Sequence, residues 1–182
     1  MTVKEIILSA ATALGVQEEV QTYINGESTD GQKTELLLHC FNIVENELAL
    51  DYLPLYAEDE IVSETGAIDF SCLAKPVVRI LRVTDEWGNS IKFKLFPDYV
   101  KTQAGKVKIT YTYTPEKKTI DGISDYVLQA SVRLFTYGIA AEYATASCLF
   151  EDAAVWDKKY KEAIAAAYHA KPCERMRSRR WA

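Results

Sequence analysis

The stretch from Asp125 to Tyr168 decides the fold, and its sequence is DYVLQASVRLFTYGIAAEYATASCLFEDAAVWDKKYKEAIAAAY. Apolar and small side chains recur in it at steps of three and four residues, the spacing that places side chains on one face of an α-helix. The pattern predicts a helical hairpin, with one helix from Tyr126 to about Ala146 and another from Leu149 to about Tyr168. The recurring residues are Val127, Ala130, Leu134, Tyr137, Ala141 and Ala144, then Leu149, Ala153, Trp156, Tyr160, Ala163 and Ala167.

The first predicted helix has a narrow face of small residues, which allows another helix to approach closely. We expect this face to pack against a helix that spans Leu36–Leu50, with two aromatic residues of the second hairpin helix anchoring the contact. Ser124 and Asp125 precede the hairpin and are predicted to cap its N-terminus. We call this predicted contact the packing seam, and its residues are Ala130, Leu134, Gly138, Ala141, Trp156 and Tyr160.

Three further helices are predicted before residue 54. The first has an apolar stripe that Gly15 ends as a C-cap, and a segment dense in turn residues precedes the third. Pro54 marks the point beyond which the third helix cannot continue. The predicted helices are Val3–Leu14, about Gln17–Ile24, and Gln32 to about Asp51.

From Leu55 onward the apolar residues alternate with polar ones, which is typical of half-buried antiparallel strands. A glycine-containing connection at residues 85–89 is predicted to join the first two strong strands as a hairpin, and residues 97–105 link the second strong strand to the third. The strong strands are Val77–Val83, Ile91–Leu95 and Val107–Tyr113, and weaker ones are Ala57–Ser63 and Ala67–Cys72.

This order of elements predicts an α+β fold in a single domain, residues 1–170. Helices in 1–53 and the hairpin in 124–169 are expected to form one bundle, and residues 54–118 an inserted antiparallel β lobe. Hydrophobic residues make up 48% of the chain and charged residues 26%, as in ordinary globular proteins. No run approaches the ~20 apolar residues of a membrane span, and the N-terminus lacks a signal-peptide pattern, so a cytoplasmic location without membrane contact is expected.

The chain offers no catalytic or metal-binding constellation. His39 and Cys40 are neighbours that point in different directions on a helix, so a structural role is expected for the histidine. His169 and Cys173 have the spacing of two metal ligands, but a proline lies between them and further ligands are missing. The acidic run at residues 58–60 lacks calcium-loop spacing and is predicted to be a solvated edge or an interface. We therefore predict no enzyme activity, no cofactor, no metal and free cysteines.

The net charge of −5 is unevenly distributed. Residues 171–182, which we call the basic tail, carry five cations against one anion, a balance of +4, so the rest of the chain carries −9. Such a tail can bind nucleic-acid phosphates or an acidic protein surface, and the alternative is a solubilising end. We predict that the tail is flexible in the free protein and orders on docking. The predicted docking residues are Arg175, Arg177, Arg179, Arg180 and Trp181.

Segments of the hairpin, the β insertion and the third helix resemble one family. They are residues 137–143 (YGIAAEY) and 150–160 (FEDAAVWDKKY), then 85–93 (DEWGNSIKF), 97–99 (PDY) and 105–111 (GKVKITY), and then 42–49 (NIVENELA). Together they are similar to the C-terminal hairpin, the preceding β module and the early helix of head-tail connector (adaptor) proteins of tailed bacteriophages. The resemblance spans about Leu36 to Tyr160.

The resemblance implies a structural virion protein of a phage or prophage. Family members assemble as a ring, commonly of twelve copies, that joins the capsid portal to the tail and lets DNA pass without specific binding. The implied partners are the portal protein, a tail or stopper protein and other copies of the chain. The implied location is the head-tail interface of the virion, and the host cytoplasm during assembly. A net acidic body is compatible with this function because it would repel the DNA backbone.

An alternative from another class is a small nucleic-acid-binding or regulatory module that uses the β lobe and the basic tail. Lys92, Lys94, Lys106 and Lys108 are spaced so that they could form a basic stripe on the solvated face of the lobe. Lysines at such positions also serve simply to keep a sheet edge soluble. The sequence leaves both interpretations open.

Overall fold

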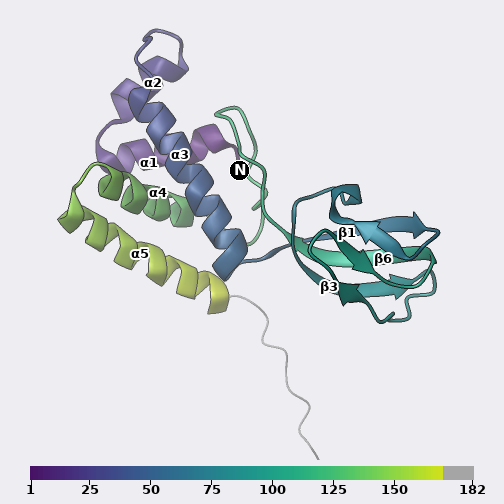
Figure 1. Cartoon of the computed structure of the whole chain (residues 1–182). Coiled ribbons are helices and arrows are strands. Elements are labelled where there is room, and N and C mark those ends of the chain that lie inside the picture. The colour runs from purple at the N-terminus through teal and green to yellow at the C-terminus, as the bar shows by residue number, and fades with distance from the viewer. Residues whose placement is uncertain (170–182) are drawn as a thin grey trace, which may run out of the picture.

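The computed structural model describes residues 1–169 and has an α+β fold (Figure 1). A helical bundle lies on one side of the molecule and a β lobe on the other. The bundle contains α1 (Val3–Leu14), α2 (Gln17–Ile24), α3 (Gln32–Glu47), α4 (Val132–Ala146) and α5 (Phe150–His169). The lobe contains β1 (Leu55–Ser63), β2 (Ala67–Asp69), β3 (Val77–Asp85), β4 (Lys94–Leu95), β5 (Tyr99–Lys101) and β6 (Gly105–Tyr113).

The predicted bounds of the first two helices and the C-cap at Gly15 are confirmed. The Thr2 side chain accepts a hydrogen bond from the Glu5 backbone N–H at the start of α1, and Gly15 ends the helix with a left-handed φ of 73°. The bounds of α2 match the prediction. Beyond α3 the chain makes a π-helical turn, Leu48–Tyr52, so helical backbone continues to the predicted end near Asp51.

The core of the bundle forms where α4 packs against α1, α3 and α5. Phe41 of α3 and Phe135 of α4 lie at its centre, with ring centroids 5.4 Å apart and both side chains fully buried. The helices from the two ends of the chain thus share one core, as the sequence predicts. Of the described helices, none is long and apolar enough to cross a lipid bilayer.

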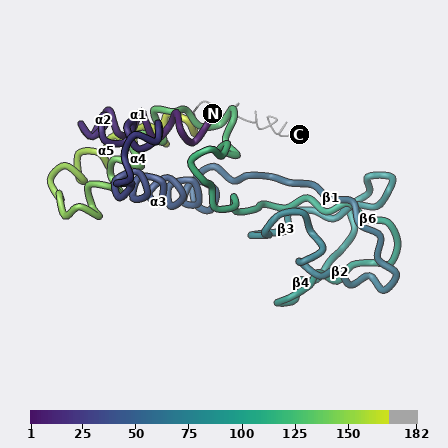
Figure 2. The backbone as a smooth tube through the Cα atoms, turned by 90° about the horizontal axis from the view of Figure 1, so that it is seen from above, coloured from purple at the N-terminus to yellow at the C-terminus, as the bar shows by residue number. Residues whose placement is uncertain are grey.

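The β lobe consists of two three-stranded antiparallel sheets, with strand orders β1-β6-β3 and β2-β5-β4. β1 pairs with β6 along its whole length, from Leu55 opposite Tyr113 to Ser63 opposite Gly105. Figure 2 shows that the chain enters the lobe after α3 and returns to the bundle after β6, so these two segments join the two parts. The lobe has its own core, separate from that of the bundle.

The predicted strand pairing is wrong in part. β3 pairs with β6 instead of the next strand in sequence, and a single bridge between Thr84 and Ser90 closes the turn at residues 85–89. β5 lies within residues 97–105, the segment predicted to link the second and third strong strands. Two β-bulges interrupt the alternation of β3, so that the buried residues Ile80 and Val83 are three positions apart and Leu81, predicted on the same face as Val83, is 41% exposed. β2 is also shorter than predicted, because Phe70–Cys72 form a 3₁₀ turn.

The first hairpin helix begins six residues later than predicted, at Val132 instead of Tyr126. Its N-cap is Ser131, whose Oγ accepts a hydrogen bond from the Leu134 backbone N–H, so the predicted cap at Ser124 and Asp125 is wrong. The hydroxyl of Tyr126 donates to the Leu53 carbonyl over 2.7 Å and holds this segment against the end of α3. The second hairpin helix agrees with the prediction to within one residue at each end.

Candidate functional site

A buried polar cluster joins α3 to the segment that returns from the β lobe. The Glu45 carboxylate is 1% exposed, and its Oε1 accepts hydrogen bonds from Ser124 Oγ over 2.6 Å and from the Asp125 N–H over 3.1 Å. Asn42 Oδ1 accepts from the Lys118 N–H over 2.6 Å, and Lys118 Nζ lies 2.7 Å from Asp125 Oδ1. We call these five residues the junction cluster.

The junction cluster has the chemistry of a structural clamp. Burial raises the pKa of Glu45, while the hydrogen bonds from Ser124 and Asp125 and the charge of Lys118 act in the opposite direction. Glu45 Oε2 and Asp125 Oδ2 are both enclosed without a hydrogen-bond partner among the described residues. Glu45 therefore uses one oxygen to hold the returning chain, and Asp125 uses one oxygen to pair with Lys118 inside that segment. The cluster fixes where the lobe joins the bundle.

Sequence reasoning missed the junction cluster because its partners lie 76 to 80 residues apart in the chain. One signal was available. Glu45 follows Phe41 by four residues and precedes Ala49 by four, so it falls on the apolar face of α3. A carboxylate on such a face needs hydrogen-bond donors from another element.

The packing seam lies where α4 meets both α3 and α5. A Cβ atom added at Gly138 would lie 2.8 Å from Val44 Cγ1 and 2.9 Å from Tyr160 Cε2, so only glycine fits between them. Of the other seam residues, Ala130, Leu134 and Ala141 are buried. Ala130 precedes α4 and is therefore not part of the helix in which we expect it.

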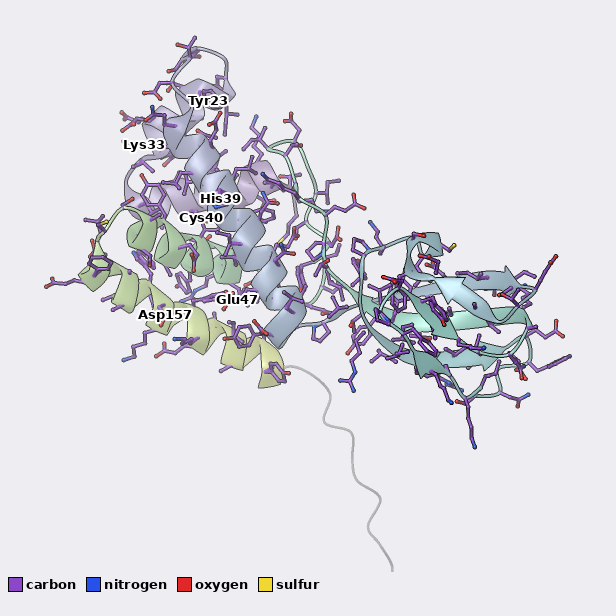
Figure 3. The ribbon with its side chains drawn as sticks, in the orientation of Figure 1. Tyr23, Lys33, His39, Cys40, Glu47 and Asp157 are labelled. Atoms are coloured by element: carbon purple, nitrogen blue, oxygen red, sulfur yellow. The ribbon has the colours of Figure 1, made fainter. Side chains whose placement is uncertain are left out.

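The two aromatic residues of the seam differ in their environment. Tyr160 is buried, and its hydroxyl donates to Glu47 Oε2 of α3 over 3.2 Å. Figure 3 labels Glu47 near the end of α3 that lies beside α5. Burial raises the pKa of Tyr160 and also that of Glu47. Trp156 is only half-buried and lies against Tyr137 of α4, with ring centroids 5.8 Å apart. Tyr160 therefore links α5 to α3, whereas Trp156 contacts α4 near the surface.

A groove of about 690 Å³ lies at the end of the hairpin where α4 begins and α5 ends. We call it the hairpin groove. Its rim carries Arg133 and Lys159, which lie over the Tyr137 and Trp156 rings respectively at 5.3 and 4.2 Å from the ring centroids. The residues that line the groove are Leu128, Gln129, Ala130, Ser131, Arg133, Leu134, Tyr137, Lys159, Glu162, Ala163, Ala166 and Ala167.

The opposite end of the hairpin carries an exposed apolar pair, which we call the knob. Leu149 is 51% exposed and Phe150 is 69% exposed, at the turn between α4 and α5. Glu151 and Asp152 follow in the first turn of α5 and are also exposed. The exposure of the knob follows from the sharp turn before it, in which Cys148 has a positive φ of 59°.

The basic stripe of the alternative interpretation does not form as a continuous feature. Lys106 Nζ lies 2.8 Å from Glu60 and Lys108 Nζ lies 2.7 Å from Glu58, so β1 carboxylates pair with both β6 lysines. The other two lysines of the predicted stripe line a shallow hollow elsewhere on the lobe, which also contains Lys101. The residues of this hollow are Ile91, Lys92, Phe93, Lys94, Phe96, Lys101, Thr102 and Gln103.

The acidic run behaves as its alternation predicts. Asp59 points inward and accepts a hydrogen bond from the Tyr111 hydroxyl over 2.7 Å, while its two neighbours face solvent and the lysines of β6. Burial and this hydrogen bond raise the pKa of Tyr111 to about 12. Within residues 1–169, no group of three or more histidine, cysteine or acidic side chains is placed to hold a metal ion.

The remaining predicted positions are scattered. His39 is exposed on α3, whereas its neighbour Cys40 is buried (Figure 3). Burial raises the pKa of the Cys40 thiol to about 11. The described cysteines, Cys40, Cys72 and Cys148, are free. Cys173 and the predicted docking residues Arg175, Arg177, Arg179, Arg180 and Trp181 lie outside the described residues.

Neither a comparison with models of known protein families nor a search of curated proteins finds a match for this chain. Function is therefore inferred from the surfaces and contacts described above.

Proposed function

We propose that the protein is a structural, non-enzymatic subunit that assembles as a ring and joins the portal of a phage capsid to the tail, as a head-tail connector. In this function it binds the portal protein, a tail or stopper protein and other copies of itself, and DNA passes through the ring. Its place is the head-tail interface of a virion, with host cytoplasm as the site of assembly.

The observation that carries this proposal is the amount of large apolar surface left exposed around the helical hairpin. Leu128, just before α4, is 94% exposed, and the knob at the other end is exposed as well. Other large apolar side chains that are exposed in this part of the chain are Ile123, Val127 and Val155. Large apolar side chains are exposed on the β lobe as well, among them Tyr56, Val62 and Trp87, and exposed apolar surface of this kind is typical of protein-protein interfaces. An assembly subunit requires at least two such interfaces.

The charge distribution also supports passage of DNA without tight binding. Residues 1–170 carry a net charge of −9. The β6 lysines that could have attracted phosphates are paired with glutamates of β1. A wall of this character repels the DNA backbone, which favours sliding.

One observation favours the alternative of a nucleic-acid-binding module. Lys92, Lys94 and Lys101 form no ion pair within the described residues, and they surround Phe93 and Phe96 in the hollow of the β lobe. Cations beside aromatic rings are the combination that binds single-stranded nucleic acids. The three lysines are the residues to test for this function.

Mass in solution discriminates between the two functions. The protein is measured by light scattering, alone and after mixing with the portal protein encoded in the same phage or prophage genome. We expect a discrete complex that contains several copies of this chain per portal ring, and DNA binding that is weak at physiological salt. A persistent monomer that ignores the portal protein, yet binds DNA with an affinity that falls steeply as salt rises, contradicts the connector function and favours the alternative.

A further inference from the structure

The two ends of the helical hairpin carry surfaces of complementary shape. The knob projects two large apolar side chains into solvent, while the hairpin groove is a hollow whose walls include Ala130, Ala163, Ala166 and Ala167. Alanine side chains leave room that a leucine or phenylalanine side chain can fill. The knob and the groove are separated by about 20 Å along α5, at 1.5 Å per helical residue, so the knob cannot fill the groove of its own chain.

The two ends are also complementary in charge. Arg133 and Lys159 at the groove rim form no ion pair within the described residues, and Glu162 offsets only one of the two charges. Glu151 and Asp152 beside the knob likewise form no ion pair there. Two cations at one end thus match two anions at the other, an arrangement that fixes the orientation of a contact.

The charge argues for a second copy as the occupant of the groove and against the basic tail. The basic tail follows α5 in the sequence, but its charge balance is +4, so Arg133 and Lys159 disfavour it as the occupant of the groove. The knob of another copy brings two negative charges, which exceed the single carboxylate of the groove, together with large apolar side chains that fit against its alanine-lined walls.

We propose that the knob of one subunit, Leu149 and Phe150 with Glu151 and Asp152, docks in the hairpin groove of the next subunit. This inference deepens the proposed function, on which it rests, by naming the contact between neighbours. Because the two surfaces differ, the contact is heterologous and leaves a free knob and a free groove at the ends of any open chain of subunits. Repetition of the contact closes a ring when the rotation per subunit divides a full turn.

Disulfide trapping between two forms of the protein tests the contact without a portal. Both forms carry Cys72→Ser and Cys173→Ser. The knob form keeps the native Cys148 beside Leu149, and the groove form carries Cys148→Ser with Ala166→Cys and a tag that changes its size. After mixing and mild oxidation, we expect the mixed disulfide dimer to exceed both homodimers.

As a matched control, Glu27→Cys, on the exposed turn before α3, replaces Ala166→Cys and should give no such excess. Equal yields for the two positions, or no mixed dimer at Ala166→Cys, overturn the proposal.

Charge reversal separates a lost contact from a lost fold. Arg133→Glu with Lys159→Glu in the groove form should reduce the mixed dimer several-fold. Glu151→Lys with Asp152→Lys in the knob form should then restore it, which a folding defect cannot do. A reduction without restoration contradicts the pairing.

If trapping succeeds while no complex forms with the portal protein, the subunit contact stands and the connector function fails. If portal complexes form while no mixed dimer is trapped and charge reversal has no effect on the complexes, the contact fails and the connector function stands.

Discussion

The β lobe and the helical bundle present very different surfaces to solvent. On the lobe, the exposed carboxylates of β1 pair with the lysines of β6 across neighbouring strands, so charges are matched within the chain. On the hairpin of the bundle, apolar side chains are exposed at both ends, and the charges beside them form no ion pair within the described residues. The lobe exposes large apolar side chains too, among them Tyr56, Val62 and Trp87. The difference between the two parts therefore lies in their charges: those on β1 and β6 are paired within the chain, whereas those at the two ends of the hairpin are left for a partner.

The largest effect is expected from overfilling the bundle at Gly138. Gly138→Leu forces a side chain into the space that Val44 and Tyr160 occupy, so we expect a loss of about 3 kcal/mol of folding free energy or outright unfolding. Urea unfolding followed by circular dichroism measures it. Ala165→Leu adds the same side chain on the exposed face of α5 and should leave the unfolding midpoint nearly unchanged. An unaltered midpoint in Gly138→Leu contradicts the packing seam.

The next effect concerns the junction between the two parts. Glu45→Ala removes the acceptor for Ser124 Oγ and the Asp125 N–H, both of them enclosed, so we expect a loss of about 2 kcal/mol. Glu45→Gln keeps an acceptor oxygen and should lose much less. Hydrogen exchange of the Asp125 amide provides a local readout, because the clamp protects it. If Glu45→Ala exchanges no faster there than the wild-type protein, the cluster does not hold the returning chain.

The two parts should also respond to pH with opposite sign. Burial raises the pKa of Glu45 above its ordinary value of 4.5, so the folded state binds this proton more tightly than the unfolded chain does. The stability that Glu45 contributes is therefore fully present below pH 4.5 and is lost as pH rises through the folded-state pKa. Glu58 and Glu60 behave in the reverse way, because hydrogen bonds from Lys108 and Lys106 lower their pKa values. Their contribution is present above pH 4.5 and is lost as pH falls.

Urea midpoints at a series of pH values on both sides of 4.5 check this sign difference. Relative to the wild-type protein, Glu45→Gln should gain stability as pH rises above 4.5. The double variant Glu58→Gln, Glu60→Gln should instead lose less stability than the wild-type protein as pH falls below 4.5. The difference for the double variant is expected to be small, because both carboxylates are exposed and solvent screens their pairs. A curve for Glu45→Gln that runs parallel to that of the wild-type protein contradicts the effect of burial on Glu45.

The smallest effect is expected from the charge pairs of the lobe. Lys106 is exposed and Lys108 is half-buried, and both pair with exposed glutamates. Replacing both lysines with methionine should leave the unfolding midpoint almost unchanged, because solvent screens such pairs. The same protein should retain its weak affinity for DNA. A marked drop in DNA binding would show that these lysines contact phosphates despite their glutamate partners, and would weaken the contrast between lobe and hairpin.

The sequence predicts those parts of the fold that local signals decide. Gly15 marks the end of α1, and small residues at helical spacing predict the close approach at Gly138. The predicted start of α4 is wrong because Ser124 makes its hydrogen bond with Glu45, 79 residues away in the chain. A local cap pattern carries no information about such a partner. Ser131, three residues before Leu134, is the cap that the chain uses.

The strand pairing and the candidate site depend on contacts that a pattern does not specify. The alternation in residues 77–83 predicts a strand, but its partner β6 lies beyond two intervening strands, and bulges change which side chains are buried. The knob and the hairpin groove combine ordinary helix residues with Leu149 and residues 128–131, which lie outside the helices. Only the turn at Cys148 and the non-helical segment before Val132 show which of them remain exposed. Surface complementarity therefore becomes visible only in the folded chain.

Electron microscopy of the wild-type protein mixed with the portal protein of the same phage or prophage tests the central claim most directly. We predict rings of this chain stacked on one end of the portal ring, with neighbouring subunits in contact through their helical hairpins. A portal ring that stays bare at high concentrations of the protein would contradict the connector function.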